Sequence, residues 1–201
     1  RIVEDVNKTA PDLIVISGDM MDAGVGEHDE FCGILNRMDA KYGVVATVGN
    51  HEVYTGIDSF SRLAEKSGIR ILRNERITIA DAIDVIGIDD DEVLRFEPEI
   101  KKDIDALMES MDKNKVTVLV YHRPRHFEKF AARGVHLQLS GHTHAGQIPP
   151  ADLIVWLAFK YPAGLHKFGD SYIHTSPGTA TWGPAMRLFS RSEITKIVLK
   201  S

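Results

Sequence analysis

The sequence predicts an α/β fold in which a mixed sheet is sandwiched by helices. Short runs rich in β-branched and aliphatic residues alternate along the chain with segments of helical spacing. Most of these runs are almost continuously apolar, which is typical of strands covered on both faces. The chain has 201 residues, of which 43% are hydrophobic, so it can bury one sizeable core. We therefore expect a single domain over residues 1–201.

Strands are predicted at residues 13–17, 44–48, 83–88, 116–121 and 135–140. Helices are predicted at residues 30–39, 57–67 and 100–113, and Gly68 and Asn114 supply stops for the last two. The tail, from residue 171 to residue 199, is expected to hold two more strands around its Pro-Gly and Gly-Pro turns.

The net charge is −5, which gives no basic footprint for a polyanion. We expect no nucleic-acid partner, whereas a small phosphorylated substrate remains compatible with this charge. The only cysteine, Cys32, allows no internal disulfide and is expected in the core.

The chain begins with Arg1, so we expect a trimmed or processed piece of a longer protein. Its longest apolar stretch, residues 153–159, is far shorter than the roughly 20 residues that span a bilayer. The sequence leaves open a cytoplasmic or a membrane-associated location for the parent, and it does not define the oligomeric state.

Residues that bind metals or transfer protons follow four of the predicted strands. The blocks are Gly18-Asp19-Met20-Met21-Asp22, Gly49-Asn50-His51-Glu52, Tyr121-His122 and Gly141-His142-Thr143-His144. Each block alone is more often a turn or a helix cap. In α/β sheets, however, ligands bind beyond the carboxyl ends of strands. Together the blocks therefore predict one metal-dependent phosphoesterase site.

Carboxylate, amide and imidazole donors form a mixed set that suits Mn, Fe or Zn. The two oxygens of Asp19 can bridge two ions. Such a pair, roughly 3.5 to 4 Å apart, clamps a phosphoryl group and activates water as hydroxide. His51, adjacent to the ligand Asn50, is then expected to face the leaving-group oxygen.

The four ordered blocks resemble those of the calcineurin-like metallophosphoesterases over nearly the whole chain. The resemblance implies a four-layer α/β/β/α sandwich of mixed sheets with a dinuclear centre. It implies the metal ligands Asp19, Asn50, His122, His142 and His144. Asp19 would bridge the two ions. Asn50, His122 and His142 would complete one metal site, and His144 would belong to the other. His51 would be the general acid, oriented by Asp22.

Residues 141–147 and Tyr54 are similar to the bacterial membrane-associated branch of this superfamily. Some members of that branch cleave phosphoester or pyrophosphate bonds in lipid-linked substrates. The resemblance therefore implies a small phosphorylated substrate, with a lipid-linked one and peripheral membrane contact left open.

One departure concerns the family's first block, Asp-x-His on the first strand. Residues 1–18 contain no histidine, so we expect the N-terminal strand to be missing from this chain. The parent would hold two ions, whereas this piece would bind one tightly and the other weakly or not at all.

Tyr54 and Arg123 are predicted substrate contacts, Arg123 because a guanidinium pairs with phosphate oxygens. A solvated arginine is the commoner alternative. The run Asp89-Asp90-Asp91 is expected to form a solvated acidic turn rather than a metal cluster.

Residues 153–162 contain Trp156, Phe159 and Tyr161. The favoured interpretation is a helix packed on the sandwich. The alternative is an exposed apolar flap that lies on a membrane or grips an acyl chain.

Two hypotheses of function follow. The first is a metal-dependent phosphohydrolase that uses His51 as its acid. The second is a metal- or phosphate-binding module in which the missing first block has crippled catalysis. The presence of His51 and Asp22 favours the enzyme, because a pure binding site needs no oriented proton donor.

Overall fold

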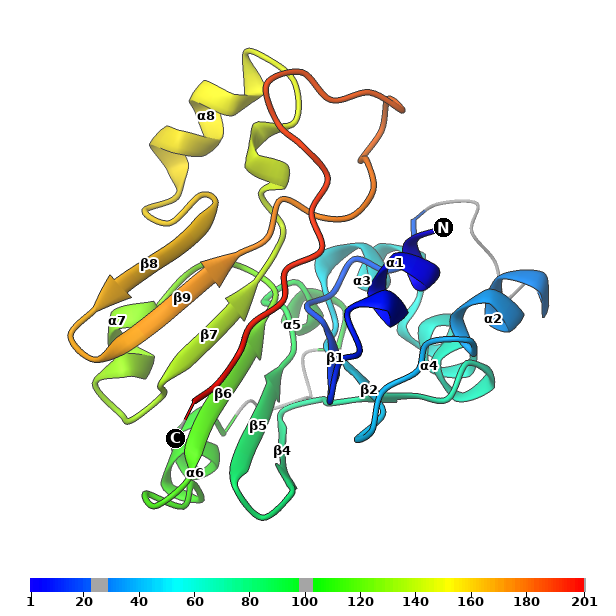
Figure 1. Cartoon of the computed structure of the whole chain (residues 1–201). Coiled ribbons are helices and arrows are strands. Elements are labelled where there is room, and N and C mark those ends of the chain that lie inside the picture. Colours follow the sequence, from blue (N-terminus) through cyan, green and yellow to red (C-terminus); the bar gives the residue numbers. More distant parts are fainter. Residues whose placement is uncertain (23–28, 98–102, 201) are drawn as a thin grey trace.

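Two sheets lie face to face in the computed structural model, which describes residues 1–22, 29–97 and 103–200 (Figure 1). The first sheet is parallel, with the order β1 (Ile14–Ile16), β2 (Val44–Ala46) and β3 (Ile69–Ile71). The second sheet is mixed, with the order β4 (Glu75–Ile79), β5 (Ile83–Ile88), β6 (Val116–Tyr121), β7 (Leu137–Ser140), β9 (Ser171–Thr175) and β8 (Gly164–Phe168).

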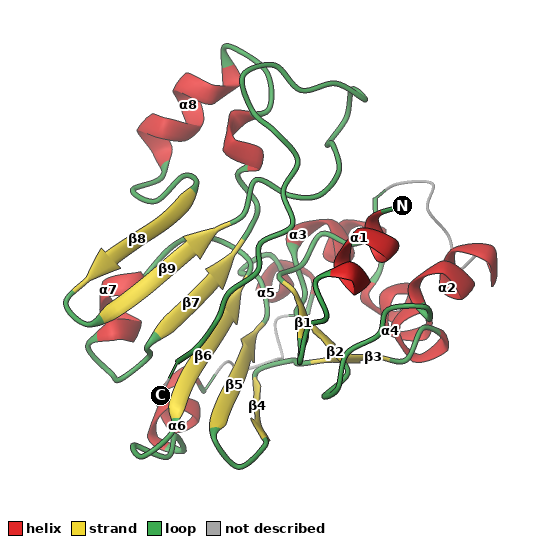
Figure 2. Cartoon of the chain, in the orientation of Figure 1, coloured by secondary structure: helices red, strands yellow, loops and turns green. Residues whose placement is uncertain are grey.

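Helices lie outside the pair of sheets (Figure 2). Those on the side of the first sheet are α1 (Ile2–Lys8), α2 (Asp29–Leu35), α3 (Asn50–Thr55), α4 (Ile57–Lys66) and α5 (Val93–Phe96). The outer face of the second sheet carries α6 (Ile104–Glu109) and α7 (Phe127–Ala131). Beyond the end of β7 follow the short 3₁₀ turn η1 (His144–Gly146) and the helix α8 (Ala151–Ala158).

Alternation along the strands divides the core into three apolar layers. On β2, Ala46 packs with Phe60 of α4, whereas Val45 faces the second sheet. On β6, Val120 faces the first sheet, whereas Leu119 packs beneath the outer helices. Two helical layers and two sheets result, which confirms the four-layer α/β/β/α sandwich.

The five strands predicted ahead of the tail all form, although β1, β2 and β7 are shorter than expected. The predicted helices form as α2, α4 and α6, and residues 100–102 of the last prediction lie outside the described residues. One tail strand forms as β9, but the second was wrong, because residues 191–200 contain no strand. Instead of a sheet ladder, this segment makes bonds such as that from Lys196 Nζ to the carbonyl oxygen of Thr9.

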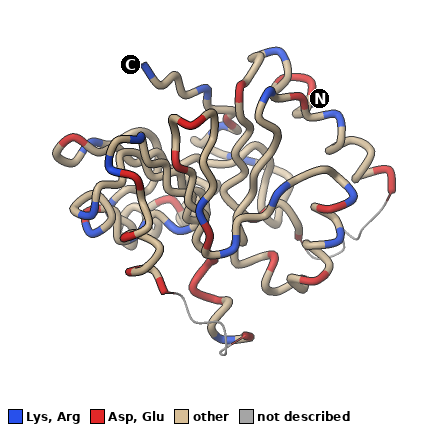
Figure 3. The backbone as a smooth tube through the Cα atoms, turned by 90° about the horizontal axis from the view of Figure 1, so that it is seen from below, with Lys and Arg blue, Asp and Glu red and all other residues tan. Residues whose placement is uncertain are grey.

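Basic and acidic positions are interspersed over the backbone in the view from below (Figure 3). Among the described residues, no helix has the length and apolar character needed to cross a bilayer.

Asp84 forms a buried polar anchor in the second sheet. Its carboxylate accepts hydrogen bonds from Arg76 (2.7 Å), Thr78 (2.7 Å) and the backbone N–H of Asp112 (3.1 Å). Burial opposes ionisation, but these bonds outweigh it and lower the pKa of Asp84. The ionised carboxylate therefore ties β4, β5 and the loop after α6 together.

We expect Asp84→Asn to lower the free energy of unfolding at neutral pH by about 2 kcal/mol, since hydrogen bonds to a charged group are lost. A lowered pKa in the folded state stabilises above the unfolded pKa, and this contribution disappears as the pH falls through the folded pKa. The difference in the free energy of unfolding between the variant and the unaltered chain should therefore shrink in acid. Urea unfolding across pH measures it, with the exposed Asp170→Asn as control; a constant difference would contradict the assignment.

Candidate metal centre

The four polar blocks meet where the strand ends of the two sheets converge. Asp19 follows β1 and Asn50 begins α3 after β2, so both belong to the first sheet. His122 follows β6 and His142 follows β7, so both belong to the second. A cavity of about 220 Å³ opens here. Its polar lining includes Asp19, Asn50, His51, His142 and His144.

Donor atoms of the predicted ligands lie within reach of one ion. Asp19 Oδ2 is 3.0 Å from His122 Nε2, and Asn50 Oδ1 is 2.8 Å from His142 Nδ1 and 3.2 Å from His122 Nε2. The ligand atoms of Asp19, His122 and His142 all fall within 4.8 Å of one another. This carboxylate, amide and imidazole set fits Mn, Fe or Zn.

His122 is oriented by a bond on the far side of its ring. Its Nδ1 donates to the carbonyl oxygen of Ser17 at 2.7 Å, and the side chain is almost completely buried. A second bond of this kind is typical of metal-binding histidines, because it fixes the ring and directs Nε2 at the ion. Here Nε2 points at Asp19 and Asn50.

The charges at the site suit a cation. Burial of Asp19 opposes ionisation, but its hydrogen bond to His122 outweighs it and lowers the pKa to about 2. Burial lowers the pKa of His142 to about 3, and the positive charge of Arg123 acts in the same direction. A carboxylate and a neutral imidazole are thus both in the protonation states that bind metals.

Two glycines allow the loops to approach this closely. Gly18 has φ +92°, and a Cβ there would lie 2.7 Å from His122 Nδ1. A Cβ at Gly49 would lie 2.3 Å from Asp19 Oδ1. Asp19 itself adopts a left-handed conformation with φ 55°. The tight turn carries the ligand carboxylate to the other loops.

Glu52 is a residue of the candidate site that the sequence analysis did not single out. Its fully buried carboxylate accepts four backbone N–H bonds of 2.6 to 2.9 Å. The donors are Asp19, Met20, Met21 and Gly49. Glu52 therefore holds the Asp19 loop against the start of α3. The sequence signal that would have revealed part of this arrangement is a glutamate three residues after the N-cap glycine of a helix, because it can cap that helix.

His51 and Asp22 form the pair predicted for proton transfer. His51 Nδ1 is 3.1 Å from Asp22 Oδ1, and the backbone N–H of His51 donates to Asp19 Oδ1 at 3.0 Å. Because Asp22 occupies Nδ1, the other ring nitrogen is left for a group in the cavity. Tyr54 packs edge-on against the imidazole, with ring centroids 5.8 Å apart.

His144 lines the same cavity but stands apart from the cluster of three ligands. Its buried Nδ1 has no hydrogen-bond partner among the described residues, as expected of a ligand to an ion. Burial, aided by the charge of Arg187, lowers its pKa. A neutral imidazole is thus held at the edge of the site.

The two predicted substrate contacts do not line the cavity. Tyr54 is 55% exposed beside His51. The guanidinium of Arg123 bonds to Asp90 at 2.8 Å and approaches Glu92 at 3.5 Å, so it serves an internal ion pair. The expected solvated acidic turn was wrong, because Asp89 and Asp90 are fully buried. Asp89 is held by Arg73, a partner that the local sequence does not reveal.

The geometry predicts an asymmetric response to metal. In a calorimetric titration with Mn²⁺, we expect one tight site in this chain, since Asp19, Asn50, His122 and His142 are already assembled. His142→Ala should weaken this binding at least about tenfold. His144→Ala should leave the tight site intact and affect only weak binding. Two equally tight ions in the unaltered chain would contradict this expectation.

Comparisons with known proteins agree with the fold and the donor set. A family model, calcineurin-like phosphoesterase, matches residues 1–146. The chain therefore belongs to the calcineurin-like phosphoesterase family, a family of metal-dependent hydrolases.

Its relatives are longer proteins. An uncharacterized metallophosphoesterase of Helicobacter pylori is 35% identical over 195 residues, which cover 96% of this chain and 52% of that protein. A transmembrane protein with metallophosphoesterase domain from Danio rerio is 34% identical over 213 residues, which cover 100% of this chain and 48% of that protein. The chain thus spans about half the length of these relatives.

Among solved structures, NAD nucleotidase of Haemophilus influenzae superposes with a TM-score of 0.53 at 15% identity. The match covers 87% of this chain and 42% of that structure. At this identity the similarity concerns the fold alone.

Proposed function

We propose that this chain is the catalytic part of a metal-dependent phosphohydrolase that cleaves a phosphoester or pyrophosphate bond. The observation that carries the proposal is the His51–Asp22 pair, 3.1 Å apart, at the edge of a cavity that also exposes Asp19, Asn50 and His142. A binding module would not need an oriented imidazole there.

Divalent cations at the site would neutralise phosphoryl oxygens and lower the pKa of the attacking water. Asp19, Asn50, His122 and His142 would hold one ion, and Asp19 and His144 would contribute to a second. The cations would draw the anionic substrate into the cavity.

His51 would deliver a proton to the oxygen of the departing group. Asp22 would accept a hydrogen bond from Nδ1–H and keep the ring oriented, so that the other ring nitrogen would face the cavity and carry the proton to be donated. Glu52 fixes the loop that carries Asp19, and the backbone N–H of His51 donates a hydrogen bond to the Asp19 carboxylate. Acid and ligand therefore keep a constant separation.

We also propose that the parent protein works at a membrane. The support is the Danio rerio relative, whose name describes a transmembrane protein. About half of that relative aligns with the full length of this chain. A lipid-linked phosphate ester is the substrate class that fits such a setting.

Mn²⁺-dependent hydrolysis of p-nitrophenyl phosphate and bis-p-nitrophenyl phosphate tests the enzyme. We expect activity that requires Mn²⁺ and is lost in Asp19→Asn. Hydrolysis without added metal in chelator-treated protein, or full activity in Asp19→Asn, would refute the proposal. Tight Mn²⁺ binding without any hydrolysis would favour a binding module.

A further inference from the structure

Helix α8 turns a face of large apolar side chains outward. Leu153, Ile154, Trp156 and Leu157 are 62%, 63%, 59% and 80% exposed. Only Asp152 and Val155 of the helix are half-buried, and no residue of it is buried. The expected helix therefore forms, but the expectation that it packs on the sandwich was wrong.

A second apolar segment lies at the same end of the molecule as α8 (Figure 1). It contains Trp182 and Phe189, which are 53% and 89% exposed. We call these two residues and the four exposed side chains of α8 the apolar crown.

Both parts of the crown are fixed to the segment that carries His144. A Cβ at Gly146 would lie 2.0 Å from the Cα of Asp152, so α8 packs directly on the 3₁₀ turn. The side chain of Gln147 exchanges two 2.7 Å hydrogen bonds with the backbone of Trp182. The crown is therefore positioned relative to the metal ligands rather than hanging from a free loop.

The crown forms the rim of the candidate metal centre. Ala151 and Val155 from the inner side of α8, together with Trp182, line the same 220 Å³ cavity as His51. A surface bound by the crown would therefore lie next to the opening of this cavity, where a substrate would enter.

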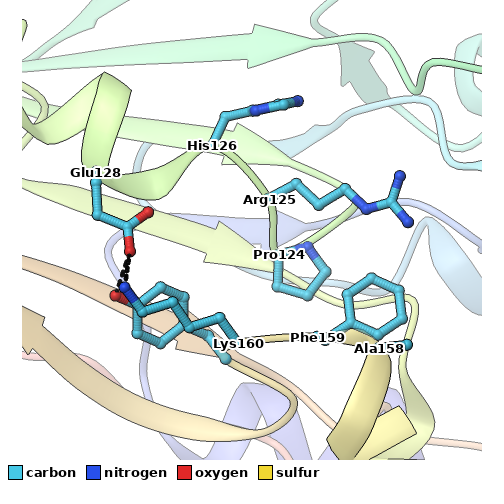
Figure 4. Close-up of a pocket in the computed structure, with 8 residues that line it drawn as sticks. Pro124, Arg125, His126, Glu128, Ala158, Phe159 and Lys160 are labelled. Carbon is cyan, nitrogen blue, oxygen red and sulfur yellow. Dashed lines mark hydrogen bonds and ion pairs between the residues drawn. The ribbon is translucent and has the colours of Figure 1, made fainter. Parts of the chain in front are cut away.

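Cations border the crown beyond the end of α8. Arg125 lies over the ring of Phe159 at 5.3 Å, and Lys160 lies over the ring of Tyr161 at 5.4 Å. Figure 4 shows Arg125 beside Phe159 around a second, shallow cavity of about 260 Å³.

Glu128 offsets part of this border, because it forms a 2.5 Å ion pair with Lys160. The chain as a whole is acidic, at −5, so a cationic border around an apolar surface is a local feature. It complements an anionic occupant.

We propose that the apolar crown inserts into the surface of an anionic lipid bilayer, with Arg125 and Lys160 at the level of the headgroups. Tryptophan and aliphatic side chains bordered by Lys and Arg are the composition that partitions into this zone. A twofold contact with a second copy would place the same cations of the two copies face to face, so their repulsion disfavours that occupant. That the substrate is a lipid-linked phosphate ester rests on the proposed function. The binding of the crown to a bilayer does not rest on it.

The chain provides its own probe, because its only two tryptophans, Trp156 and Trp182, both lie in the crown. We expect phosphatidylglycerol-containing vesicles to shift the intrinsic fluorescence to shorter wavelength and to carry the protein upward in a flotation gradient. Phosphatidylcholine vesicles alone should bind it more weakly, since the cationic border then lacks its partner.

The variant Ile154→Ser with Leu157→Ser should lower the affinity for anionic vesicles at least about tenfold. Its control is Ile2→Ser with Ile34→Ser, which removes two aliphatic side chains, 44% and 36% exposed, from α1 and α2 across the molecule (Figure 1). The control should bind as the unaltered chain does.

Absence of both flotation and a fluorescence shift with anionic vesicles would overturn the inference. An equal loss of vesicle affinity in the control variant would also overturn it. So would a concentration-dependent dimer that is lost in the crown variant, if the unaltered chain does not bind vesicles. Hydrolysis of soluble p-nitrophenyl esters reports separately on the enzyme, so either proposal can fail without the other.

Discussion

Replacing His51 with glutamine lowers kcat for an alkyl phosphate ester by an expected 100- to 10,000-fold or so, the usual contribution of a positioned acid. The imidazole lines the cavity and is held by Asp22 at 3.1 Å. Glutamine keeps a similar volume but cannot deliver a proton at neutral pH. The metal ligands are untouched, so Mn²⁺ affinity should change little.

The leaving group makes this test specific. p-Nitrophenolate departs without protonation, so His51→Gln should cost it only about tenfold or less. A large loss for the alkyl ester and a small loss for the nitrophenyl ester identify an acid. Equal losses for both esters would show that His51 acts in another way. His166→Gln, on β8 and outside the cavity lining, is the matched control.

Glu52→Gln is expected to have the largest effect on stability. Both carboxylate oxygens accept backbone N–H groups, two on each. An amide places an NH₂ group against two of these donors and leaves them buried without an acceptor. At 1 to 3 kcal/mol for each unsatisfied donor, the free energy of unfolding should fall by about 4 kcal/mol.

The same substitution should weaken Mn²⁺ binding about 10- to 100-fold, because the loop that carries Asp19 is released. Urea unfolding and calorimetric titration measure the two effects. The exposed Glu65→Gln on α4 is the control and should change neither quantity measurably. If Glu52→Gln retained full stability and metal affinity, the loop would be held by other contacts.

The clustering of the candidate metal ligands was predictable from the sequence because each of these residues follows an apolar strand. Asp19, His122 and His142 carry that signal within their own neighbourhoods, and the sheet topology then brings them together. Which ion each ligand prefers, and the roles of His51 and Asp22 in turnover, stay predictions.

Features that depend on distant partners were not predictable in this way. Asp89 and Asp90 lie in an acidic run typical of a solvated turn, but Arg73 and Arg123 reach them from other strand ends. Glu52 holds a loop more than thirty residues away. An apolar segment such as α8 has the composition of a core helix, and only its position beyond the strand ends leaves it exposed.

The origin of the ligands in two different sheets has a mechanical consequence. Asp19 and Asn50 belong to the three-stranded sheet, and His122 and His142 to the six-stranded one. An ion bound by all four would act as a cross-link through the middle of the sandwich, alongside the apolar layer between the sheets. Separation of the two halves would then require release of the ion, so the metal would make their unfolding a single cooperative event.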